Sequence, residues 1–160
     1  MRNVFSYLLP AAGFIGLASF GFQDEPTFKP SDKEFIVGAT MTRYNIGFGG
    51  GDCQTEVSSG QKTLDSLYLM LKSRPYIKME IGVHEGKPCK GCKKCNPSQN
   101  AADAIRDYLV KKSIDKSRLS TVGYGMTMPL LNDTTGDGKP TEKAARLNER
   151  VVFKITYSKY

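Results

Sequence analysis

Four cysteines and a single histidine are the side chains of this chain whose type and spacing could do chemistry. Cys89, Cys92 and Cys95 recur at every third position in the lysine-rich stretch CKGCKKC, and Cys53 precedes them. The interpretation that we favour is two structural disulfides, one from Cys53 into the cluster and one within it. A bridge from Cys53 would close a long loop and stabilise the fold by roughly 4 kcal/mol in the chain-entropy model.

Two other uses of the cysteines remain open. Three thiolates of the cluster with Cys53 or His84 would form the tetrahedral ligand set that zinc prefers. The neighbouring lysines would lower the pKa of a thiol, which is typical of redox-active cysteines. If the chain is exported to an oxidising compartment, as the N-terminal composition discussed below predicts, disulfides are favoured over a zinc site. No thioredoxin-like context supports redox chemistry. Because neither Cys-x-x-Cys pair is followed by histidine, a c-type haem site is excluded, and we expect no cofactor.

His84 and Glu85 lie where an apolar run ends and the cysteine loop begins. The run YIKMEIGV alternates apolar and polar residues, which predicts a β-strand. Ligands of α/β proteins often bind at the carboxyl end of such a strand, so these two residues are candidate binding residues. The sequence offers no Ser-His-Asp set and no acid pair suited to hydrolysis, so we do not expect an enzyme.

The N-terminal composition predicts export. Arg2 is followed by a mostly apolar stretch without charge, so residues 1–22 resemble a signal peptide or a retained N-terminal anchor. We expect residues 23–33, polar and proline-containing, to form a linker and residues 34–160 to form one domain. Net charge is +7 and the pI is about 9.2, which favours acidic partners. No nucleic-acid-binding motif is present, so a cell-wall polymer, an envelope protein or a membrane surface is the expected class of partner.

The elements that must position these residues follow an α/β order. We expect Ser58 or Ser59 to cap the first helix, Pro75 to end it, and Asn96 or Ser98 to cap the second. The predicted elements are a strand or strand pair in 34–48, a helix around 64–71, a strand at 76–83, a helix to about Lys112, a strand at 118–125, a helical turn at 142–147 and a strand at 148–157. Helical crossovers join parallel strands, so the loops after the first two strands should open on one edge of the sheet.

These segments resemble the OmpA-like C-terminal domain, the peptidoglycan-binding module also found in Pal and MotB. The resemblance runs from about Phe35 to Tyr157 and is carried by IGVHE, SQNAADAIRDYL, RLSTVGYGMTMP and RLNERVVF. It implies a β-α-β-α-β-(α)-β sandwich, in which a mixed four-stranded sheet carries helices on one face. It also implies a non-catalytic protein that attaches to peptidoglycan in the periplasm or at the outer membrane of a Gram-negative bacterium.

The resemblance also implies where the ligand would bind. In the family an Asp after the second strand and an Arg on the following helix hold the diaminopimelate of the stem peptide. Glu85 stands at the Asp position and Ala101 at the Arg position, whereas Asn148 and Arg150 match the family pattern. We therefore expect His84, Glu85, Asn148 and Arg150 to line the remaining groove. The alternative is a module that no longer binds diaminopimelate and serves as a subunit of an envelope complex.

Overall fold

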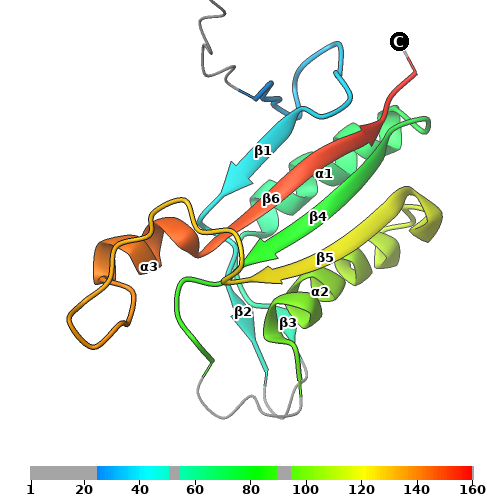
Figure 1. Cartoon of the computed structure of the whole chain (residues 1–160). Helices are drawn as coiled ribbons and strands as arrows, with labels where there is room; N and C mark the ends of the chain where they lie inside the picture. The colour runs from blue at the N-terminus through cyan, green and yellow to red at the C-terminus, as the bar shows by residue number, and fades with distance from the viewer. Residues whose placement is uncertain (1–24, 51–54, 90–94, 160) are drawn as a thin grey trace, which may run out of the picture.

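A four-stranded mixed sheet carries the fold in the computed structural model, which describes residues 25–50, 55–89 and 95–159 (Figure 1). The strand order is β1-β6-β4-β5, with β4 and β5 parallel and β6 antiparallel to both of its neighbours. The strands are β1 (Thr40–Arg43), β4 (Lys78–His84), β5 (Leu119–Gly125) and β6 (Arg150–Tyr157). A separate pair, β2 (Phe48–Gly49) and β3 (Glu56–Val57), lies between β1 and the first helix in the chain.

Two long helices cover one face of the sheet, as Figure 1 shows: α1 (Gln61–Ser73) and α2 (Pro97–Lys111). A short 3-10 turn (Lys116–Arg118) leads into β5, and α3 (Glu142–Asn148) precedes β6. Met79 and Ile81 of β4 and Phe153 of β6 are fully buried beneath the two long helices, as their alternating pattern predicts. The predicted α/β class with helices on one face of a mixed sheet is confirmed. No helix in the described part of the chain is long and apolar enough to cross a membrane.

The strand directions bring two loops together at one edge of the sheet. Because β6 is antiparallel to both β1 and β4, and β4 is parallel to β5, the three strands β1, β4 and β5 run the same way. The loops after β1 and β4 therefore open on the same edge, as predicted. The crossover through α2 joins adjacent strands, whereas the crossover through α1 skips the position that β6 occupies.

The start of α2 is as predicted, whereas the start of α1 is not. Asn96 caps α2 by accepting a hydrogen bond from the Gln99 backbone, and proline occupies the first turn. At α1 the capping position is Gly60, at a φ of 90°, and no side chain caps the helix. The Ser59 hydroxyl instead accepts a hydrogen bond from the Gly47 backbone, so this serine ties two loops together.

The first predicted strand is shorter than its composition suggests. Gly38 has a φ of 92°, which turns the chain out of the extended conformation before β1 begins. The residues just before this turn belong to no strand, and the Phe35 ring packs edge-on against Phe28 at 5.8 Å between centroids. Further upstream, Thr27 forms an isolated parallel bridge with Thr40 of β1. Residues 25–33, which we expected to be a linker, thus contribute Phe28 to the hydrophobic core.

Candidate functional site

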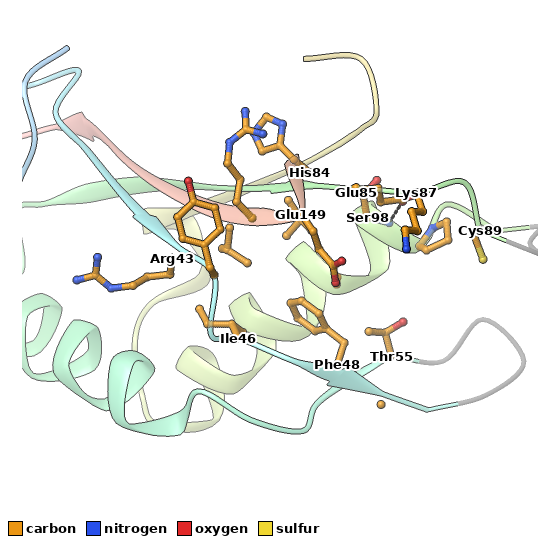
Figure 2. Close-up of a pocket in the computed structure, with 18 of the residues that line it drawn as sticks. Arg43, Ile46, Phe48, Thr55, His84, Glu85, Lys87, Cys89, Ser98 and Glu149 are labelled. Carbon is orange, nitrogen blue, oxygen red and sulfur yellow. Dashed lines mark hydrogen bonds between the residues drawn. The ribbon is translucent and has the colours of Figure 1, made fainter. Parts of the chain in front are cut away.

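A pocket of about 360 Å³ opens at the edge where the loops after β1 and β4 meet (Figure 2). Its apolar lining comes from the β1–α1 segment, the ends of β4 and β6, and α2: Ile46, Phe48, Val83, Ala101 and Val151. Its polar and charged lining includes Arg43, Tyr44, Thr55, His84, Glu85, Lys87, Cys89, Ser98, Glu149 and Arg150. The volume is that of a small-molecule site.

Glu85 is fixed between the end of β4 and the first turn of α2. Its backbone N–H donates to the Gly125 carbonyl at 2.7 Å, and its carboxylate accepts from the Ser98 backbone N–H at 3.0 Å. The Ser98 hydroxyl in turn donates to the Asn96 side chain and accepts from the Gly125 N–H. A carboxylate is favoured at this place because the N-terminus of a helix carries partial positive charge. The family-aligned acid therefore has a defined position in the pocket wall.

Glu149 is a second carboxylate of the pocket, and sequence reasoning missed it. It follows α3 directly and is exposed. Figure 2 shows its side chain extending from the sheet toward Phe48. Within the described residues, no donor bonds to its carboxylate. Its place between Asn148 and Arg150, two positions that match the family pattern, was the signal that could have found it.

The residues on either side of Glu149 hold the β5–α3 connection in place. The Asn148 side chain accepts hydrogen bonds from the Leu130 and Leu131 backbone at 2.8 and 3.0 Å and donates to the Leu131 carbonyl at 2.9 Å. The Arg150 guanidinium donates to the carbonyls of Asn148 and Met128 at 3.1 and 3.0 Å. Both side chains are buried, so their polar groups are used within the fold.

The other two cations of the pocket are also directed elsewhere. Arg43 donates to the Thr42 carbonyl, and Figure 2 shows its side chain pointing away from Glu149. Lys87 forms an ion pair with Glu142 of α3 at 2.6 Å. Among the described residues, the Glu149 carboxylate of the pocket therefore has no hydrogen-bonding or ionic partner, while the cations of the lining contact other groups.

His84 belongs to the opposite face of the sheet from Phe48, as Figure 2 shows. Its ring stacks on Tyr124 with centroids 4.7 Å apart, and the Tyr124 hydroxyl donates to Glu80 at 2.9 Å. The Nδ1 atom is buried and has no hydrogen-bond partner in the part of the chain that the structure describes. Burial, and secondly the positive charge of Arg150, lower the pKa of His84 to about 4. The ring is therefore neutral at pH 7.

Comparison with known proteins identifies the family. The model of the OmpA family matches residues 54–143, more than half of the chain. The chain belongs to the OmpA family. Outer membrane protein A of Yersinia pseudotuberculosis is 30% identical over 100 residues, which cover 59% of this chain but only 27% of that protein. A MotB-like protein from Desulfovibrio vulgaris shares the fold with a TM-score of 0.60 at 20% identity, over 74% of this chain and 75% of that one.

The structure brings three of the four predicted OmpA-family groove residues to the pocket. Glu85 and Arg150 line it, and His84 contributes to its lining although the His84 ring lies on the opposite face of the sheet from Phe48. Asn148 is not part of the lining and instead holds the β5–α3 connection. Ala101, at the position of the family Arg, lines the same pocket as Glu85. The two positions that hold the ligand in the family thus face one cavity, and the ligand-binding roles of the four residues stay predictions.

One residue of the cysteine cluster, Cys89, borders this pocket. Cys89 is part of the lining together with Thr55, which follows the segment that contains Cys53. Cys53 and Cys92 lie outside the described residues, and neither Cys89 nor Cys95 is a free thiol. Among the described residues no group of three ligands could hold a metal ion. Both the disulfide pairing and the alternative zinc set that includes Cys53 and Cys92 remain predictions.

Proposed function

We propose that this chain is a non-catalytic module of the cell envelope that attaches to peptidoglycan through the pocket beside Glu85. The observation that carries the proposal is that Glu85 and Ala101 line one cavity of about 360 Å³. These are the positions at which the family pattern holds the diamino acid of the stem peptide. The cavity is large enough for one such side chain, and its apolar lining suits the aliphatic part.

The proposed location is the periplasm, at or near the outer membrane of a Gram-negative bacterium. Support comes from family membership, from the name of the Yersinia relative and from the export-type composition of residues 1–22. An oxidising compartment of this kind is also where disulfides among the four cysteines would persist.

Cosedimentation with purified peptidoglycan tests the proposal. The oxidised full chain should pellet with the polymer, and an excess of soluble stem peptide released from the same polymer should compete it away. The Glu85→Gln variant should lose most of this binding because the wall carboxylate of the pocket is neutralised, while Glu34→Gln, an exposed acid outside the pocket, serves as the matched control. Binding that fades with salt and ignores the competitor would be adhesion of a basic surface and would contradict the proposal.

A second candidate function is favoured by one specific observation, the absence of a guanidinium at Ala101. Under this proposal the chain is a subunit of an envelope protein complex, and the basic cysteine loop is its contact surface. Replacing the loop lysines with alanine should then release a partner and leave peptidoglycan binding unchanged; these lysines are Lys87, Lys90, Lys93 and Lys94. Loss of peptidoglycan binding in that variant would argue against it.

A further inference from the structure

Among the described residues of the pocket, the carboxylates can accept hydrogen bonds from a ligand, whereas the cations contact other protein groups. Glu149 extends into the space next to Phe48 and has no bonded donor among the described residues. Glu85 uses one carboxylate oxygen to accept from the Ser98 N–H, which leaves its second oxygen without a hydrogen bond in the described part of the chain. Both acids line the same cavity. A cationic group in the pocket would therefore meet acceptors on two walls.

Among the described residues, a ligand carboxylate would have no comparable partner. Arg150 donates to two backbone carbonyls in a buried setting, and Lys87 is directed to Glu142 of α3 in a pair that is more than half exposed. Arg43 points away from Glu149 (Figure 2). At the position of α2 where the family has its carboxylate-binding Arg, this chain has Ala101, which is 5% exposed and carries no polar group. A carboxylate in this space would leave water without gaining a salt bridge to any described residue and would lie near Glu149.

The remaining lining is suited to an aliphatic chain. Ile46 and Phe48 of the β1–α1 segment and Val83 at the end of β4 face the same cavity. The small side chain of Ala101 leaves room beside them, because a larger residue there would extend into the space. Apolar contact of this kind supplies affinity, while the few polar groups decide which end group is accepted.

We propose that the pocket selects an amino group at the end of an aliphatic side chain and rejects a free carboxylate beside it. Glu149 is the residue that determines this specificity, with Glu85 as the second acceptor. Applied to peptidoglycan, and resting on the function proposed above, the preferred ligands are stem peptides with lysine or with an amidated diaminopimelate at the third position. The unamidated diaminopimelate peptide is the disfavoured ligand.

Calorimetric titration of the full chain with three synthetic tripeptides tests the inference. They have the form L-Ala-D-Glu-X, where X is L-lysine, amidated diaminopimelate or unamidated diaminopimelate. We expect the first two to bind at least tenfold more tightly than the third. Glu149→Gln should weaken the lysine peptide about tenfold and reduce the discrimination, whereas the remote Glu34→Gln should change neither. Because Glu149 is exposed, this variant is expected to fold like the wild type.

A reciprocal variant sharpens the test. Ala101→Arg places a guanidinium in the cavity and should reverse the preference in favour of the unamidated peptide; thermal unfolding followed by circular dichroism checks that it folds. Equal or tighter binding of the unamidated peptide to the wild type would overturn the inference, and so would unchanged affinity in Glu149→Gln. If sacculi still bind in either case, only the inference fails. If neither sacculi nor any tripeptide binds, the proposed function fails with it.

Discussion

The consecutive residues Asn148, Glu149 and Arg150 belong to two different regions of the molecule, the buried frame around the β5–α3 connection and the lining of the pocket. Asn148 and Arg150 are 6% and 7% exposed, and their polar groups bond to the backbone between β5 and α3. Glu149 between them is exposed and extends toward the pocket. The two positions that match the family pattern therefore belong to the frame of the fold, and the position between them belongs to the lining of the pocket. A motif match indicates the fold here, whereas the residue between the matched positions faces the pocket that we propose as the ligand site.

The largest loss of stability is expected where the frame is closest packed. A Cβ atom on Gly123 of β5 would lie 2.2 Å from the backbone N of Gln99, so α2 would have to move away from the sheet. We expect Gly123→Ala to lower the free energy of unfolding by about 3 kcal/mol. Urea unfolding measures this, and Gly136→Ala, where nothing lies within 4 Å of the added atom, is the control. Equal losses in the two variants would contradict close packing at Gly123.

The frame should also be sensitive to acid through His84. Its folded pKa of about 4 lies below the ordinary value of 6.5, so the unfolded chain binds the proton more readily. Stability is therefore lost as the pH falls from 6.5 toward 4, by about 2–3 kcal/mol at pH 4.5. His84→Phe keeps an aromatic ring against Tyr124 but cannot take up a proton. The difference in unfolding free energy between wild type and variant should change by this amount between pH 7 and 4.5, and a constant difference would exclude the effect.

The parts of the fold that the sequence predicts are those with local signals. Asn96 and Pro97 begin α2 because cap and first-turn preferences depend only on neighbouring residues. The period-two pattern likewise predicts which side chains of β4 face the core. The α1 cap could not be predicted, because the Ser59 hydroxyl bonds to Gly47, which only the tertiary fold brings near. The end of the first strand depends in the same way on the positive φ of Gly38.

The candidate site was predictable in part for a related reason. Glu85 has a sequence signal, since it follows an alternating strand in a family motif. Glu149 has none of its own, and the directions in which Arg43 and Lys87 point depend on partners distant in the chain. The frame role of Asn148 depends on a connection that begins many residues earlier. Long-range contacts, not residue types, thus separate the frame from the pocket.

A smaller loss of unfolding free energy should distinguish the frame, represented by Asn148, from the pocket lining, represented by Glu149. Asn148→Ala leaves the backbone N–H groups of Leu130 and Leu131 without their acceptor, and we expect a loss of about 2 kcal/mol in unfolding free energy. Glu149→Gln, one residue further, should leave unfolding unchanged and alter only ligand binding. Parallel urea titrations check both. A stability loss in Glu149→Gln comparable to that in Asn148→Ala would break the division between frame and pocket.

The smallest effect is expected at the ion pair between the cysteine loop and α3. The side chains of Lys87 and Glu142 are 56% and 61% exposed, so water and salt screen their attraction. Lys87→Gln should therefore leave the urea midpoint unchanged at both low and high salt. The loop is held more firmly at Gly86, where a Cβ atom would lie 2.0 Å from the Ala145 carbonyl oxygen. If Lys87→Gln lowered the midpoint at low salt only, the ion pair would be holding this wall of the pocket, and ligand affinity should then fall with salt as well. An unchanged midpoint means that backbone packing at Gly86 positions the wall, so that any salt dependence of ligand binding reports on the ligand's own charge.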